Sequence, residues 1–281
     1  MPIYDQTYRK YDARAPLRQV RFWPITREAL RLVLAKRAFL GLLALSVLPF
    51  IVRVVQIFVV THFPEAGRVL PVDGRLFGEF LNQQLVFTLL LTIFGGAGLV
   101  ANDLRTGAIV MYLARPLTRR DYVLGKLGVT LLLNLMVTLV PALLLYVVAL
   151  GLAPELFLHW SLAWIAPAIA LHSLLMSLSV SLLGLAVSAL TRRATAAGIG
   201  LFAFVAGLDL VRQVLEHGFN RPEATLLSLQ DNLRNVARAL FGLADRAEPV
   251  SWMASLAVVA LLAVGCLLVL RQRVRAVEIV S

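Results

Sequence analysis

Cysteine and histidine are scarce in this sequence. The single cysteine, Cys266, lies inside an apolar run, so the chain can form neither an internal disulfide nor a thiolate metal cluster. The four histidines are scattered. His172 falls within another apolar run, where we expect a packed helix residue rather than a ligand. The sequence therefore predicts no metal site in this chain.

The motifs of several enzyme classes are absent as well. Gly125-Lys126 is followed by Leu127 and is not part of a G-x-x-x-x-G-K-[ST] phosphate loop. Neither H-E-x-x-H nor G-x-S-x-G occurs. An intramembrane enzyme, as an alternative, would need a serine–histidine, paired-carboxylate or metal constellation at matched depth, and none is visible. We therefore expect that the chain is not an enzyme, with no catalytic residue and no bound cofactor.

Charged residues are also few. They make up 15% of the chain, whereas a soluble domain carries about a quarter. Hydrophobic residues make up 59%, the mean hydropathy is +0.82, and apolar runs of about twenty residues recur. This composition predicts an all-α polytopic membrane protein. The first 37 residues are polar and basic, and they contain no signal-peptide pattern.

Six of the apolar runs are long enough to cross a bilayer, within a transmembrane domain over residues 38–270. Pro49 in the first run is expected to allow a kink, and the third run contains Pro141. Residues 1–37 form an arm before the spans, and 271–281 a tail after them. The expected spans are 38–60, 85–101, 123–151, 162–190, 194–215 and 251–270.

Two segments outside the spans have the pattern of amphipathic helices. From Pro24 onward, leucine and valine share one helical face and arginine the other, which predicts a helix lying in the membrane interface before the first span. A plain cytoplasmic extension of that span is the alternative. The connection 216–250 carries apolar residues at three- and four-residue steps, which predicts a second helix at the outer membrane surface.

The distribution of cations predicts the orientation of the spans. With the amino terminus inside, the inner segments hold nineteen Lys or Arg and the outer segments six, while acidic residues show the opposite bias. Both termini are then cytoplasmic, in the cell inner (plasma) membrane. The net charge of +11 is explained by this bias, and we expect no nucleic-acid partner.

Three charged residues are expected near the membrane interior: Arg53, Asp209 and Arg212. A charge at the bilayer centre costs roughly 2.5–3.5 kcal/mol on insertion scales, so each needs a partner or water. Asp209 and Arg212 are three residues apart and can pair on one helix face, and Arg53 can reach Asp209 if the two helices touch. Internal pairing is one interpretation of these charges. The other is that they line a substrate path.

Small residues recur within two of the spans. Gly95-Gly96-Ala97-Gly98 ends the second span, where helices can approach closely or unwind. The fourth span carries a small, mostly polar stripe at steps of about four residues, which places its members on one helix face. The stripe consists of Ser173, Ser177, Ser181, Gly184 and Ser188.

A short basic segment, 102–122, separates the second span from the third. Gly107–Ala114 is expected to form two helical turns, which Pro116 ends. Thr118 and Asp121 then form a capping-box-like start of the next helix. The segment predicts a small docking helix at the cytoplasmic face, framed by cations.

The order of these parts resembles the permease subunit of type-two ABC transporters, the exporter-like group that shares its fold with the G subfamily. The resemblance covers almost the whole chain. Its most specific residues are Asp103-Leu104-Arg105-Thr106-Gly107, then Ala114-Arg115-Pro116-Leu117-Thr118-Arg119, then Tyr122-Val123-Leu124-Gly125-Lys126. They look like the family's acidic glycine–threonine turn, its R-P-[ST]-R element and its aromatic-x-x-G-K close. The turn here has Thr-Gly-Ala where many members have Gly-Thr-Leu.

The resemblance implies a dimeric exporter built with a second permease copy or a paralogous permease. Two copies of a separate ABC ATPase subunit would bind ATP and Mg and drive transport. The Gly107–Ala114 helix would be the main coupling helix, and the Arg192-Arg193 turn a secondary contact. A membrane scaffold without transport remains the alternative. The residues implied in coupling are Asp103, Arg105, Gly107, Ile109, Met111, Tyr112, Arg115, Arg119, Arg192 and Arg193.

Overall fold

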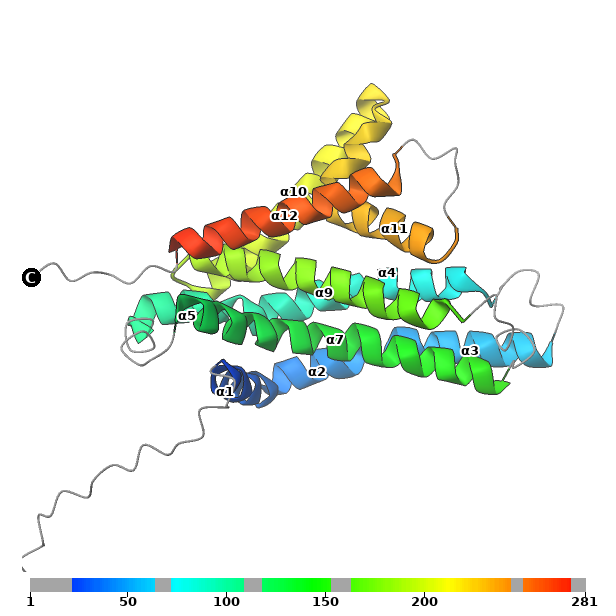
Figure 1. Ribbon diagram of the computed structural model, residues 1–281, viewed down its shortest axis with the longest axis horizontal. Helices are drawn as coiled ribbons and strands as arrows, with labels where there is room; N and C mark the ends of the chain where they lie inside the picture. The colour runs from blue at the N-terminus through cyan, green and yellow to red at the C-terminus, as the bar shows by residue number, and fades with distance from the viewer. Residues whose placement is uncertain (1–21, 64–71, 109–117, 153–162, 244–249, 274–281) are drawn as a thin grey trace, which may run out of the picture.

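The computed structural model describes residues 22–63, 72–108, 118–152, 163–243 and 250–273. Within these ranges the chain forms helices and no strand. Six helical segments are long and apolar enough to cross a membrane, so the chain is a multi-pass membrane protein, as the sequence predicts. Figure 1 shows them as a bundle with its helices side by side.

The six spans begin and end close to the predicted bounds, with one large exception, the second. The first span is broken into two helices between Leu45 and Leu48, just before Pro49. The spans are α2 and α3 (Arg37–Leu45, Leu48–His62), α4 to α5 (Gly74–Thr106), α7 (Arg119–Leu152), α9 (Ile165–Leu190), α10 (Ala194–Phe219) and α12 (Trp252–Arg273).

The second span begins at Gly74, eleven residues before the expected start at residue 85. The prolines and glycines of residues 61–78 predicted a turn-rich connection before this span, yet its last five residues are helical. The glycines instead allow close packing, since a Cβ on Gly74 would lie 2.7 Å from the carbonyl oxygen of Phe241. Asp73 caps the helix by accepting a hydrogen bond from the Arg75 backbone N–H at 2.8 Å.

A π-helix interrupts the second span at the expected glycine-rich position. α4 (Gly74–Leu91) is followed by η2 (Thr92–Gly96), a π-helix, and then by α5 (Gly98–Thr106). Ser188 of α9 supports this junction. Its hydroxyl donates to the Ala97 carbonyl at 2.6 Å and accepts from the Ala101 N–H at 3.0 Å. The junction is therefore held by a side chain from a neighbouring helix.

The small polar stripe of α9 faces the centre of the bundle. Its members are buried, and three of its serines bond to neighbouring helices: besides Ser188, Ser181 accepts from Asn134 of α7 at 3.1 Å, and Ser177 lies 3.2 Å from the Thr138 hydroxyl. Asn134 also donates to Thr92 of η2 at 3.0 Å. Short side chains here allow close contact, and their hydroxyls satisfy one another away from water.

Gly184 provides a sharp test of this packing. A Cβ at this position would collide with Cγ2 of Thr92, so we expect Gly184→Ala to cost about 1–3 kcal/mol of stability. The double variant Gly184→Ala/Thr92→Ser should recover most of the loss, because serine lacks the methyl group and keeps the hydroxyl. Gly207→Ala, where a Cβ would meet nothing within 4 Å, is the control. Thermal unfolding in detergent measures each variant, and an unchanged Tm for Gly184→Ala would refute the contact.

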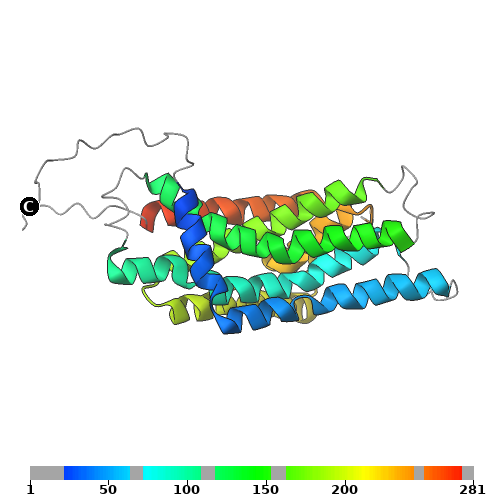
Figure 2. The ribbon, with the colours of Figure 1, turned by 90° about the horizontal axis from the view of Figure 1, so that it is seen from below.

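The helix predicted before the first span is present as α1 (Trp23–Leu34) and lies across the bundle (Figure 2). Two glycines of α7 allow it to pack closely, since a Cβ on Gly125 would lie 3.0 Å from Cβ of Ile25. The Thr26 hydroxyl also donates to the Gly125 carbonyl at 2.9 Å. The helix is confirmed, and its place at a membrane surface stays a prediction.

The helix predicted within 216–250 is also present, as α11 (Leu229–Leu240) after the short 3-10 helix η4 (Pro222–Leu227). Ser228 caps it by accepting from the Asp231 N–H at 3.2 Å. Leu233 and Val236 on its apolar face are buried, and α11 packs against α4, α9 and α12. Protein therefore covers the apolar face of α11, and its place at the outer membrane surface stays a prediction.

Candidate functional site

Exposed arginines gather at one end of the bundle, which we call the basic end. There α5 and α12 finish, α7 begins, and α9 turns into α10 (Figure 1, left). Cations grouped at one end of a bundle favour one orientation in the membrane. The exposed arginines of the basic end are Arg105, Arg119, Arg120, Arg192, Arg193, Arg271 and Arg273.

A three-residue cluster joins α5 to α7 at the basic end. Lys126 of α7 lies 2.8 Å from Oδ2 of Asp103, and the Tyr122 hydroxyl donates to the same oxygen at 2.8 Å. The lysine side chain is 7% exposed and the aspartate 15%, so water screens the pair little. The cluster fixes the two helices that lead into and out of segment 109–117.

The helix ends beside this segment are also defined. α5 ends at Gly107, whose φ of +69° is the left-handed conformation that glycine adopts at low cost. α7 begins with the predicted capping box: the Thr118 N–H and hydroxyl donate to Asp121 Oδ2 at 2.9 and 2.7 Å, and the Asp121 N–H donates back to Thr118 at 3.2 Å. The segment 109–117 thus starts and finishes at fixed points.

The structure places some of the predicted coupling residues and leaves others open. Arg192 and Arg193 lie exposed in the turn between α9 and α10, at the same end of the bundle as the α5–α7 cluster. The predicted helix Gly107–Ala114 stays a prediction. The structure describes six of the predicted coupling residues, all at the basic end: Asp103, Arg105, Gly107, Arg119, Arg192 and Arg193. The other four lie outside the described residues: Ile109, Met111, Tyr112 and Arg115.

Tyr122 and Lys126 were missed as site residues by the sequence analysis. Both were noted only as part of a family-like motif. Their four-residue spacing places them on one face of α7, toward a buried acidic partner, and that spacing was the available signal. The partner itself, Asp103, is nineteen residues from Tyr122 in sequence, and no local pattern links the two.

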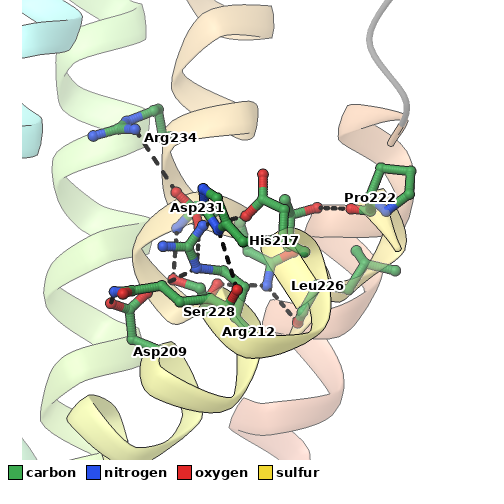
Figure 3. Close-up of polar contacts among 12 residues, drawn as sticks. Asp209, Arg212, His217, Pro222, Leu226, Ser228, Asp231 and Arg234 are labelled. Carbon is green, nitrogen blue, oxygen red and sulfur yellow. Dashed lines mark hydrogen bonds and ion pairs between the residues drawn. The ribbon is translucent and has the colours of Figure 1, made fainter. Parts of the chain in front are cut away.

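A second polar group surrounds Arg212 of α10 (Figure 3). Its Nε lies 2.9 Å from Asp209 Oδ1 and 3.1 Å from Asp231 Oδ2, and its Nη1 lies 2.6 Å from Glu216 Oε2. Arg234 approaches Asp231 at 3.7 Å. The predicted pairing of Asp209 with Arg212 is confirmed. We call these five residues the Arg212 cluster.

Arg53 belongs to a different place in the bundle. Its guanidinium lies 3.2 Å from Glu79 of α4 and donates to Gln56 at 2.8 Å, so it pairs with these residues rather than with Asp209. Glu79 falls in the part of α4 that the sequence analysis placed outside the second span. Because the second span was predicted to begin at residue 85, Glu79 was not considered as a partner of Arg53.

A groove of about 250 Å³ lies between α4 with η2 and α10, beside the Arg212 cluster. α10 packs against α5 and η2, and its later half diverges from the bundle (Figure 1). Eight lining residues are apolar: Val86, Leu89, Leu90, Ile93, Leu201, Phe202, Val205 and Ala206. The polar lining residues are Asp209, Ser228 and Gln230.

Among the described residues, no group of three or more His, Cys, Asp or Glu is arranged to hold a metal ion. A scan against protein-family models and a search of curated proteins found no match to the chain.

Proposed function

We propose that this chain is the membrane-spanning permease subunit of an ATP-driven type-two ABC transporter, working as an exporter. The observation that carries the proposal is the basic end, where the end of α5 and the start of α7 are fixed on either side of segment 109–117 and carry exposed arginines. Such an arrangement suits a docking element that receives force from a partner in the cytoplasm. Both termini would then be cytoplasmic, in the inner (plasma) membrane.

The cluster of Asp103, Tyr122 and Lys126 supports force transmission. A displacement of segment 109–117 acts first on α5 and α7, because the cluster ties these helices together. From α5 it reaches α9 through Ser188, which bonds the backbone at the α5 start. Packed helices tied by short polar contacts move as rigid bodies, which is the kind of motion that alternating access requires.

The partners follow from the same proposal. Two copies of an ABC ATPase would hold ATP and Mg and contact segment 109–117 and the Arg192-Arg193 turn. A second permease copy or a paralogous permease would complete the pore. Large apolar side chains of α10, such as Ile199 and Phe202, are 69% and 64% exposed, which suits either lipid or a second permease there.

Co-purification tests the proposal. A tagged copy of the full chain, extracted from its own membrane in mild detergent, should retain an ATP-hydrolysing protein at near one-to-one stoichiometry. Its ATPase activity should change when the complex is moved into lipid nanodiscs. A complex with no nucleotide-hydrolysing companion, or a companion whose activity is indifferent to the membrane subunit, would contradict the proposal and favour a scaffold.

A further inference from the structure

We infer that the groove between α4 and α10 binds an amphipathic organic cation, with its apolar body along the helices and its cationic head beside Asp209. The claim that this cation is the transported substrate rests on the proposed function. The claim that the groove binds it rests on the groove alone. The groove combines apolar walls with a single polar end of negative sign, which fits one class of occupant.

The walls of the groove select an apolar body. Leu89, Leu90 and Ile93 line it on one side and Phe202 and Val205 on the other. Its volume of about 250 Å³ lies just below the roughly 300–1,000 Å³ of typical ligand pockets. Val86 and Phe202 are 53% and 64% exposed, so a ligand can enter sideways from the bilayer. An alkyl chain or a small ring system fits such a space.

The polar end of the groove is confined to three residues. Asp209 contributes a carboxylate, and Ser228 and Gln230 contribute a hydroxyl and an amide at the start of α11. Every other lining residue is apolar, so a ligand must place its polar head here. The guanidinium of Arg212 does not line the groove. A head group therefore meets the acidic side of the Arg212 cluster.

The charge of the cluster decides the sign of the head group. Three carboxylates, Asp209, Glu216 and Asp231, surround Arg212, and only Arg234 adds a second positive charge at 3.7 Å from Asp231. One negative charge is in excess. Asp209 accepts bonds from the side chains of Arg212, Gln213 and Ser228, and a carboxylate has about four acceptor sites. It retains the capacity to meet a cationic head.

A bilayer lipid is the competing occupant. Its acyl chain fits the same walls, but a neutral or anionic head group gains nothing from the excess negative charge. The attraction between a cationic head group and the Asp209 carboxylate is screened less near the membrane interior than in water. The cation should therefore bind the groove more tightly than a lipid does.

Three probes with the same decyl chain test the inference: decyltrimethylammonium, decyl glucoside and decanoate. Binding to the purified full chain is measured by native mass spectrometry after release from detergent micelles. We expect decyltrimethylammonium to bind roughly tenfold more tightly than decyl glucoside, and decanoate to bind most weakly. Equal affinity for all three would identify a lipid-filled groove and overturn the inference, as would a preference for decanoate.

Three variants locate the binding. Asp209→Asn should remove the preference for the cation, about tenfold, and leave decyl glucoside binding unchanged. Glu216→Gln is the matched comparison: it removes an equal charge from the cluster at a residue that does not line the groove, so it should reduce the preference for the cation less than Asp209→Asn does. An equal loss in both variants would place the cation outside the groove and contradict the inference. Ala206→Trp fills the groove and should weaken all three probes, which keeps the test valid if Asp209→Asn fails to fold.

The same probes separate this inference from the proposed function. Cation-selective binding by a chain that has no ATPase companion would contradict the transporter alone. An assembled complex whose ATPase responds equally to decyltrimethylammonium and decyl glucoside would contradict the cation class alone. The combined result that we expect is selective binding together with stimulation by decyltrimethylammonium that Asp209→Asn abolishes.

Discussion

Replacing Met111 and Tyr112 with glutamate is expected to abolish coupled transport while the chain still assembles in the membrane. If segment 109–117 docks on an ATPase through apolar contacts, two buried carboxylates at that contact each cost several kcal/mol, which is enough to release the partner. The readout is ATPase activity of the co-purified complex and transport by reconstituted vesicles.

The control for this variant is the same change at the opposite end of the bundle. Phe63 is 64% exposed after α3, and Phe63→Glu should leave coupling intact. If Met111→Glu/Tyr112→Glu transports at the normal coupled rate, the segment is not the docking element. If Phe63→Glu is equally inactive, the loss is a general effect of added charge.

Asp103→Ala is expected to destabilise the basic end by about 3 kcal/mol, because breaking a buried ion pair leaves the remaining charge poorly compensated. The variant also removes the acceptor of the Tyr122 hydroxyl. A drop in Tm measured in detergent, together with lost coupling, is the predicted outcome. Asp103→Asn keeps an acceptor oxygen and should fall between the variant and the wild type.

A double variant tests the cause of that loss. Asp103→Leu/Lys126→Leu replaces the ion pair with apolar groups and should recover most of the stability, since no charge is then buried. Glu28→Ala, at an exposed carboxylate of α1, is the control and should change little. A double variant as unstable as Asp103→Ala would show that the ion pair is not the reason.

The periodicity and the hydropathy of the sequence predicted the parts of the fold that depend on local pattern. The six spans, the helix after Pro24, the capping box at Thr118 and the polar stripe of α9 are all found. Each of these features is determined within a few turns of chain. A sequence window therefore contains the information that specifies them.

Long-range pairing explains what the sequence analysis missed. The second span begins earlier than predicted, and the polar run Asn82-Gln83-Gln84, which lowers the local hydropathy, lies within α4. Gln84 is nevertheless buried, and its side chain donates a hydrogen bond to the Ser46 carbonyl at 3.0 Å. Asp231 joins Arg212 from a different helix, and Tyr122 joins Asp103 across segment 109–117. A buried polar residue and an exposed one look the same in sequence until their partners are known.

The most direct measurement of the central claim is the membrane side on which the basic end lies. Cys266 is the only cysteine, so a Cys266→Ser background with Arg120→Cys places a single thiol at the exposed start of α7. The account predicts that a membrane-impermeant maleimide labels this thiol only after the cells are permeabilised. Labelling in intact cells would put the basic end outside, where no ATP-hydrolysing partner can reach it, and would contradict the account.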